Sequence, residues 1–312
     1  MQKSFWLKDT SKGYLALVIT SFFWGTTWVA SKIAVQEISS IQLASIRQLI
    51  AGLCFVSYFL FYKKTPLPTS KQWRWLMVMS ILMFVFANWL STWGLKYIST
   101  GLGALIGSLY PLSVVLIEWI FFKSKKITIL TFIGLFLGIA GVIFVFYSSM
   151  FAQLSYTLIF GLSLSVFAML SWSLGTVFLV RNKTNINPYY ATGWQMLLSS
   201  CILFIISFFT NQVKPIALIS FNVWAAILYL VIFGSVISFV AFIYSTKKLP
   251  PAISSLYAYI NPIVAIIVAA ILLGEKISVS LIWGAIVTLI GIFLVNYSVK
   301  KDEEKVIVEP EI

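Results

Sequence analysis

Two stretches of this chain repeat each other in the same register, about 150 residues apart. The matched positions, first half to second, are Trp24 and Trp172, Arg47 and Gln195, Tyr110-Pro111 and Asn261-Pro262, Lys126-Ile127-Thr128 and Lys276-Ile277-Ser278, Gly134 and Gly284, Gly141 and Gly291, and Tyr147 and Tyr297. Almost everything between these positions is apolar. The repeat therefore predicts a membrane protein built from two related halves, which is the plan of many secondary transporters.

The apolar residues form continuous runs that fix the fold class. Hydrophobic residues make up 60% of the chain and charged residues 10%, whereas a soluble domain carries about 25% charged residues. Runs of about twenty residues match a hydrocarbon core of about 30 Å, and their continuity excludes an alternating β-barrel. We expect an all-α membrane protein with ten transmembrane helices, at residues 14–33, 41–62, 74–95, 102–122, 129–148, 157–180, 191–210, 222–245, 252–273 and 281–299.

The basic residues predict the orientation of the spans. They account for the net charge of +13 but stand in short clusters between apolar runs, which argues against nucleic-acid binding. With the N-terminus inside, 17 of the 22 Lys and Arg residues fall in inner segments and 4 in outer ones. Both termini are therefore expected in the cytoplasm. Five spans per half is an odd number, so the second half should be inverted relative to the first.

The same reading divides the chain into four parts. Residues 1–13 form a cytoplasmic segment, 14–148 the first five-helix repeat, 157–299 the second repeat, and 300–312 a charged tail that we expect to be disordered. No cleavable signal peptide is expected, because the first apolar run is too long for one.

Glycine and proline positions predict helix packing and bends. Gly134, Gly138 and Gly141 share one face of the fifth span, and Gly284 and Gly291 share the matching face of the tenth. Small residues of this kind let helix backbones approach closely in lipid.

Proline stands in the fourth and ninth spans at matched positions. Pro111 follows three glycines in the fourth span, and Pro262 lies in the ninth. Each proline could act as a functional hinge or produce only a static kink.

Several motifs together resemble a known family. They are Trp24-Gly-Thr-Thr-Trp-Val-Ala-Ser-Lys32, then Arg47, then Asn261-Pro262, then Leu273-Gly-Glu-Lys-Ile-Ser278. This combination is similar to the EamA-type transporters of the drug/metabolite transporter superfamily. The resemblance implies a ten-helix secondary transporter in a bacterial cytoplasmic membrane. It also implies a central cavity lined by helices 1, 3, 4, 6, 8 and 9, with helices 5 and 10 as scaffold. One departure is Ser124-Lys125, where a match to Gly274-Glu275 would stand.

Ionisable residues within the spans are few. The chain has no histidine, and its two aspartates lie outside the spans. We therefore expect no metal site, no cofactor and no enzyme. Glu118 is the one acid clearly inside a span. It could be a protonatable coupling group or bind a cationic part of the solute, or it could be structural, pairing with Lys123 or Lys125.

Arg47 and Lys32 are the other charges of interest. Arg47 could hold a solute carboxylate with two hydrogen bonds. It could equally be neutralised by Glu37 or donate to exposed carbonyls at a helix end. For Lys32, near the end of the first span, an anchor at the membrane interface is the preferred interpretation.

Aromatic and amide residues form the predicted binding pocket. A cavity with aromatic walls and a few amide and hydroxyl groups suits a small amphipathic solute. The predicted solute-binding residues are Trp24, Thr27, Trp28, Asn88, Trp89, Thr92, Tyr110, Trp172, Tyr257, Tyr259 and Asn261.

The predicted function is a secondary transporter that moves a small metabolite by alternating access, as exporter or exchanger. An amino acid or a similar zwitterionic or neutral solute is preferred. The alternative is an exporter of hydrophobic or cationic organic compounds, with a channel as a weaker candidate. The expected partners are the solute and the lipid bilayer. Protons are one candidate for the coupling ion. The protein could be a monomer or a homodimer.

Overall fold

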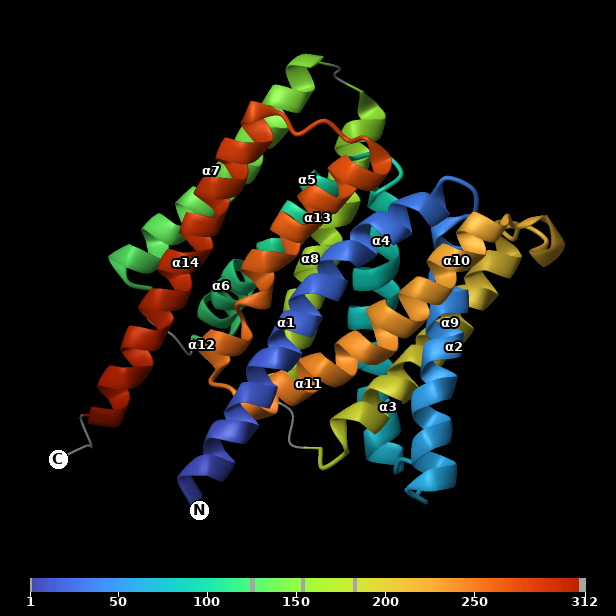
Figure 1. Cartoon of the computed structure of the whole chain (residues 1–312), viewed down its shortest axis with the longest axis horizontal. Helices are drawn as coiled ribbons and strands as arrows, with labels where there is room; N and C mark the ends of the chain where they lie inside the picture. The colour runs from blue at the N-terminus through green and yellow to red at the C-terminus, as the bar shows by residue number, and fades with distance from the viewer. Residues whose placement is uncertain (1, 124–126, 153–154, 182–183, 309–312) are drawn as a thin grey trace.

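The computed structural model describes residues 2–123, 127–152, 155–181 and 184–308, and within these ranges it contains helices and no β-strand. Helices α1 and α14 begin and end the described chain at the same face of the molecule, the lower side in Figure 1. We call this the terminal face. The face that carries the loops 36–39, 95–99, 210–220 and 274–278 is called the opposite face.

The first half contains five spans, two of which change helix type along their length. In order, its elements are α1 (Gln2–Val35), α2 (Ser40–Ser57) with η1 (Tyr58–Tyr62), α3 (Ser70–Met79) with η2 (Ser80–Trp89) and α4 (Leu90–Gly94), α5 (Thr100–Ser108) with α6 (Tyr110–Phe122), and α7 (Ile129–Ala152).

The second half follows the same order from the other side. Its elements are α8 (Tyr156–Arg181), α9 (Pro188–Phe209), the short η3 (Ile216–Leu218), α10 (Phe221–Tyr229) with η4 (Leu230–Ile237) and α11 (Ser238–Lys248), α12 (Pro251–Ser254) with α13 (Tyr257–Leu273), and α14 (Val279–Val308). Because α1 starts at the terminal face and α8 at the opposite face, the two halves are inverted (Figure 1).

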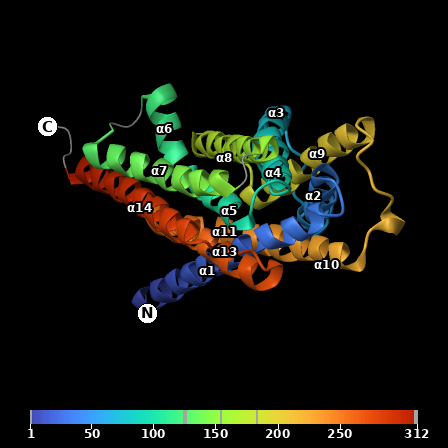
Figure 2. The same cartoon turned by 90° about the horizontal axis from the view of Figure 1, so that it is seen from above.

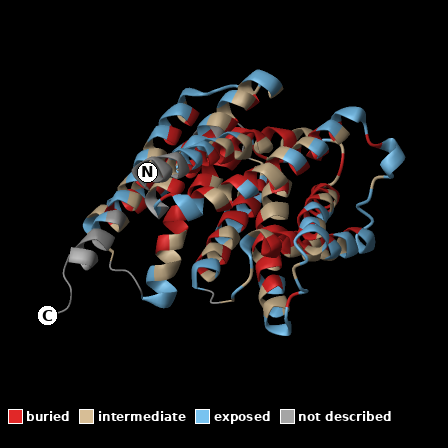
Figure 3. Cartoon of the chain, turned by 60° about the horizontal axis from the view of Figure 1, so that its bottom comes forward, coloured by how far each residue is buried: buried red, intermediate tan, exposed pale blue. Residues whose placement is uncertain are grey.

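Length and composition agree with ten membrane spans. Nine helical segments of the described residues are long and apolar enough to cross a membrane, and the shorter apolar helix α13 is the tenth. Large apolar side chains are exposed on the outside of the helices, for example Phe61 at 80% and Phe136 at 66%. Buried residues gather between the helices (Figure 3). The predicted fold class, an all-α membrane protein with two inverted five-helix repeats, is confirmed.

The helix ends follow ordinary capping chemistry. The hydroxyl of Ser39 accepts a hydrogen bond from the N–H of Gln42 at the start of α2, and Ser99 does the same at the start of α5. Thr69 and Gln72 cap each other at the start of α3. These side chains satisfy N–H groups that have no partner within the helix.

The third and eighth spans each contain a π-helical segment at matched positions, η2 and η4. A π-helical turn is wider than an α-helical one and often marks a functional site. Neither π-helical segment was predicted from the sequence.

Helices α7 and α14 pack against each other along one edge of the molecule (Figure 2). A Cβ at Gly134 would lie 2.7 Å from the carbonyl oxygen of Gly291, and one at Gly141 would lie 2.6 Å from that of Gly284. Only glycine permits such an approach, because any side chain would overlap the partner backbone. The close helix packing predicted for these glycines is confirmed, and the structure shows that the fifth and tenth spans are each other's partners.

The structure interrupts the fourth and ninth spans at different places relative to their prolines. The fourth span breaks at Leu109, two residues before Pro111. The ninth breaks between α12 and α13, at residues 255–256, and then continues as helix through Pro262. A proline in the first turn of a helix loses no bond, whereas Pro262 withholds one from the helix interior. Hinge motion at Pro111 and Pro262 stays a prediction.

The two chain ends differ from the expected segments. Helix α1 begins at Gln2, within the segment 1–13, and α14 continues to Val308, although the tail 300–312 was expected to be disordered. Lysine and glutamate are good helix formers, so a helix can continue beyond the apolar run. Residues 124–126 and 309–312, which the sequence predictions also covered, lie outside the described ranges.

Candidate functional site

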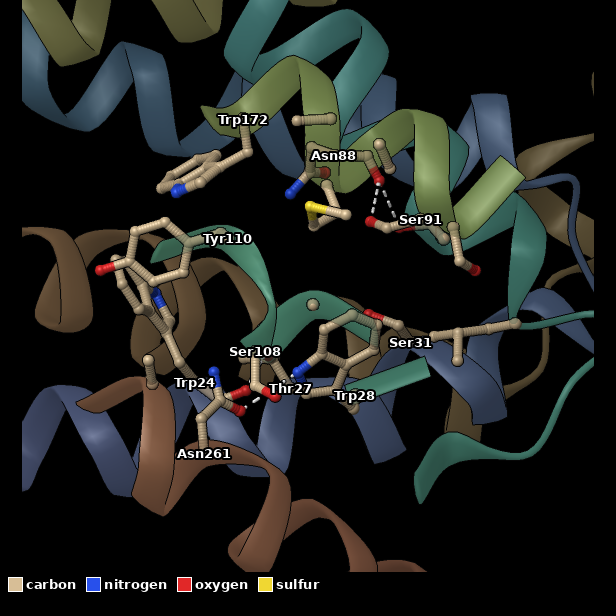
Figure 4. Close-up of a pocket in the computed structure, with 18 of the residues that line it drawn as sticks. Trp24, Thr27, Trp28, Ser31, Asn88, Ser91, Ser108, Tyr110, Trp172 and Asn261 are labelled. Atoms are coloured by element: carbon tan, nitrogen blue, oxygen red, sulfur yellow. Dashed lines mark hydrogen bonds between the residues drawn. The ribbon is translucent and has the colours of Figure 1, made fainter. Parts of the chain in front are cut away.

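A cavity lies between the two halves and has a volume of about 970 Å³, counting its open mouth. Its lining comes from the first, second, third, fourth, sixth, eighth and ninth spans. At one end lie Trp24, Tyr110 and Trp172; Ser31 and Ser91 lie toward the other (Figure 4). Ser31 is one turn from the end of α1 at the opposite face, so the cavity extends from mid-membrane toward that face. The scaffold helices α7 and α14 contribute nothing to this lining.

Most of the predicted pocket residues line this cavity. They are Trp24, Thr27, Trp28, Asn88, Thr92, Tyr110, Trp172, Tyr257 and Asn261. The structure thus brings together predicted side chains from five spans that are far apart in the sequence.

Trp89 and Tyr259 do not line the cavity, in contrast to the prediction. The indole of Trp89 stacks on Trp93 and donates a hydrogen bond to the hydroxyl of Ser40 at 3.2 Å. The hydroxyl of Tyr259 accepts a hydrogen bond from Asn296 of α14 at 2.7 Å. Both residues lie next to true lining residues in sequence, but the helical turn directs them to other helices.

An aromatic cluster closes the cavity toward the terminal face. The ring of Trp24 lies edge-to-face with Trp172 at 6.2 Å and with Phe239 at 5.4 Å between centroids. Tyr110 and Tyr257 stack beside them at 5.6 Å. We call Trp24, Trp172 and Phe239 the aromatic partition.

A second cavity of about 770 Å³, counting its mouth, lies on the other side of this partition. It reaches the loop at Thr184 and Ile186 on the terminal face and includes Gln195 of α9. Trp172 and Phe239 line both cavities. The two cavities therefore approach each other from opposite faces and meet at the aromatic partition.

Arg47 lines the first cavity and is 7% exposed. Its Nε donates a hydrogen bond to the hydroxyl of Ser235 in η4 at 2.9 Å. Gly234 makes room for the guanidinium, because a Cβ there would lie 3.2 Å from Nη2. Arg47 thus reaches from the first half to the second and presents its remaining N–H groups at the cavity.

Glu37 does not neutralise Arg47, which was one of the predicted alternatives. Its carboxylate accepts hydrogen bonds from the N–H of Ser220 at 2.7 Å and from its hydroxyl, and it forms an ion pair with Lys214 at 2.9 Å. The hydrogen bonds from Ser220, supported by Lys214, lower the pKa of Glu37 to about 2. Glu37 therefore ties the loop after α1 to the start of α10.

One hydrogen bond orients the side-chain amide of Asn88 and leaves its nitrogen available to the cavity. Gln48 donates from Nε2 to Oδ1 of Asn88 at 3.3 Å, and Ser199 in turn donates to the side-chain oxygen of Gln48. The hydroxyls of Ser91 and Thr92 donate to the backbone carbonyl of Asn88 (Figure 4). Since Oδ1 is occupied, Nδ2 is the atom that Asn88 offers to a solute.

Pro262 contributes to the cavity through the residue four positions earlier. Proline has no N–H, so the carbonyl of Ala258 cannot form its helical hydrogen bond with Pro262 inside α13. Ala258 lines the cavity. Pro111 stands in the first turn of α6, where no such bond is lost.

Glu118 lies outside the cavity lining and forms an ion pair with Arg181 at 3.7 Å. The predicted structural partners were Lys123 or Lys125, of which Lys125 is outside the described residues. Arg181 also stacks over Phe122 at 4.0 Å. The ion pair joins α6 to α8 near the terminal face and favours the structural alternative for Glu118 over the coupling one.

At the opposite face, two charged residues hold the loop between α4 and α5. Lys32 donates to the carbonyl of Leu95 at 2.5 Å and to that of Ile98 at 2.9 Å, so it is not an anchor that faces the lipid. The carboxylate of Glu275 accepts from the N–H of Thr100 at 3.0 Å and from its hydroxyl at 2.6 Å. Lys32 thus lies at the C-terminus of α4, and Glu275 lies at the N-terminus of α5. Helix dipoles favour a cation at the first position and an anion at the second.

Known proteins place this arrangement in a family. The EamA-like transporter family matches residues 11–147 and 159–297, one match for each half. The chain belongs to the EamA-like transporter family. It is accordingly a multi-pass membrane transporter.

Similar proteins cover most of the chain. The uncharacterized inner membrane transporter YedA of Escherichia coli is 27% identical, over 84% of this chain and 83% of its own length. The uncharacterized transporter YoaV of Bacillus subtilis is 23% identical, over 92% and 97%. A WAT1-related chloroplastic protein of Arabidopsis thaliana is 30% identical, over 91% and 69%. One solved crystal structure shares the fold, with a TM-score of 0.65 at 15% identity over 94% of this chain and 99% of that one.

Proposed function

We propose that this protein is a secondary transporter that carries a small amphipathic metabolite, an amino acid or a similar zwitterionic or neutral solute, by alternating access. The observation that carries the proposal is the pair of cavities that meet at the aromatic partition. A channel needs one continuous pore, whereas a carrier needs a site that is reached from one face at a time. Trp172 and Phe239, which line both cavities, form the barrier in this state.

The composition of the first cavity supports a solute with an apolar body. Tryptophan, tyrosine, phenylalanine and methionine side chains contribute the large apolar walls, and serine, threonine, asparagine and arginine side chains stand between them. Such a site binds the apolar part of a solute by burial and fixes its orientation by a small number of hydrogen bonds. We propose exporter or exchanger activity in a bacterial inner membrane, with both termini in the cytoplasm.

Counterflow in proteoliposomes tests this function. Vesicles are loaded with a mixture of unlabelled amino acids, and the uptake of labelled members of the mixture is followed. A carrier shows uptake that saturates and is stimulated by unlabelled solute on the far side. Uptake that rises linearly with concentration and ignores the far side would contradict the proposal, as would no uptake of any member.

A further inference from the structure

We propose that Arg47 and Asn88 form a carboxylate-binding subsite, so that the transported solute is a monoanionic or zwitterionic carboxylate with an apolar body. This inference rests on the proposed function, which it narrows from amphipathic solutes in general to carboxylates. It also assigns a binding role to Arg47, for which a structural role and a binding role were both open.

The first argument is the state of the Arg47 side chain. A guanidinium has five N–H donors, and the structure uses one, from Nε to Ser235. No carboxylate among the described residues forms an ion pair with Arg47, since Glu37 pairs with Lys214 and Glu118 with Arg181. A buried charge without a counter-ion is costly. An anion bound in the cavity would offset this cost.

The second argument is the charge of the whole lining. Arg47 is the one charged residue among those that line the first cavity, and no aspartate or glutamate stands there. A cationic solute would therefore meet repulsion without a compensating acid. A dianion such as a phosphate monoester would need a second cation, which the lining does not supply. A single carboxylate matches the single guanidinium.

The third argument is the second donor. Gln48 holds Oδ1 of Asn88, so the amide nitrogen is the free end. Arg47 and Asn88 both line the same cavity. A carboxylate has two oxygens that accept hydrogen bonds. A guanidinium and an amide nitrogen at one cavity offer donors to both oxygens.

The contrast with the other half strengthens the assignment. The matched residue of Arg47 is Gln195, which lines the second cavity and is equally buried, at 4% exposed. The fold thus accepts an uncharged amide at this position of a repeat, and helix packing by itself does not require arginine. The charge is specific to the cavity that reaches the opposite face.

Binding of matched compounds to the purified full-length protein tests the proposal. The compounds are 3-phenylpropionate and its amide, L-phenylalanine and its amide, and phenethylamine, which share a ring but differ in charge. Tryptophan fluorescence and the thermal unfolding midpoint report binding at millimolar concentrations. We expect each acid to bind at least about tenfold more tightly than its amide, because hydrogen bonds to a charged group are strong. Equal binding of acids and amides, or no binding of either acid, would overturn the proposal.

Three variants assign the preference to the subsite. In R47Q the acids should bind no better than the amides, whereas Q195A in the second cavity should keep the wild-type ratio. If R47Q changes the unfolding midpoint but leaves the ratio intact, Arg47 is structural and the proposal is wrong. N88D tests the subsite independently if R47Q does not fold. It keeps the bond from Gln48 but replaces the donor by an anion, so acid binding should fall at least about tenfold; unchanged acid binding would contradict the subsite.

The outcomes separate this proposal from the transport function. Acid binding that depends on Arg47, without counterflow, would retain the subsite and contradict transport. Counterflow of solutes that carry no carboxylate, unchanged in R47Q, would retain transport and contradict the subsite.

Discussion

Trp24 of the first half and Trp172 of the second occupy matched positions in the repeat, and their rings meet edge-to-face at 6.2 Å between centroids. The pair lies where two cavities from opposite faces approach each other. Inversion of the halves brings matched residues together near the middle of the membrane. A contact between two such residues can therefore close the site whether the protein is open to one face or to the other.

Removing an aromatic ring at this end of the cavity should abolish transport while the protein still folds. We predict that W24A and Y257A each abolish counterflow, because both rings lie at the partition end of the first cavity. W24F keeps a ring at the partition and should retain part of the activity. Membrane expression and gel-filtration profiles serve as the control for folding. Unaltered transport in both alanine variants would remove the proposed pocket.

The ion pair of Glu118 predicts a structural role. Because Glu118 pairs with Arg181 and lies outside the cavity lining, E118Q should leave the pH profile of counterflow unchanged. The loss in stability should stay below about 1 kcal/mol, as for other partly exposed ion pairs. A flattened pH profile in E118Q would instead assign Glu118 to proton coupling.

Glu37 should make stability depend on pH in the acid range. Its pKa is lowered to about 2 in the folded protein, below the value of about 4.3 for an unfolded chain. A lowered pKa stabilises the fold above about pH 4.3, and this stabilisation is lost as the pH falls toward 2. The difference in unfolding midpoint between wild type and E37Q should therefore shrink over that range. K96Q, a change of an exposed residue on the same face, should show no such trend. A difference that is constant with pH would contradict the assignment.

The scaffold pair α7 and α14 should be sensitive to a single methyl group. In G291A the new Cβ would lie 2.6 Å from the carbonyl oxygen of Gly134. We predict a loss of about 1–3 kcal/mol in stability, the usual cost of overpacking. I290V, at an exposed site on the same helix, is the control and should change little. Equal thermal midpoints for G291A and wild type would contradict the prediction, because they would show that α7 and α14 can move apart without a loss of stability.

The sequence was sufficient to predict features that depend on spacing along one helix or on the repeat. Ten spans and the inversion of the halves follow from the apolar runs and the offset of about 150 residues. The glycines of the fifth and tenth spans predicted close helix packing, but not that the two spans are each other's partners. Trp24 and Trp172 were grouped because they are repeat mates, and the structure places them in contact.

Features that depend on side-chain direction across helices could not be predicted in the same way. Trp89 follows Asn88 in sequence, yet Trp89 bonds to Ser40 and Asn88 lines the cavity, because consecutive residues on a helix point in different directions. The pairing of Glu37 with Ser220 instead of Arg47 depends on a loop 183 residues away in sequence. The sequence did not define a role for Glu275. Its carboxylate caps α5 at Thr100, which lies 175 residues away in the sequence.

Accessibility of the two cavities tests the central claim most directly. The background is C54A/C201A, because the native cysteines are exposed. Single cysteines replace Ser91 in the first cavity and Thr192 in the second, and a membrane-impermeant maleimide is applied to one face at a time. Alternating access predicts that S91C reacts from the opposite face and T192C from the terminal face, and that solute which raises one rate lowers the other. Simultaneous labelling of both sites from a single face would show a continuous pore and contradict the account.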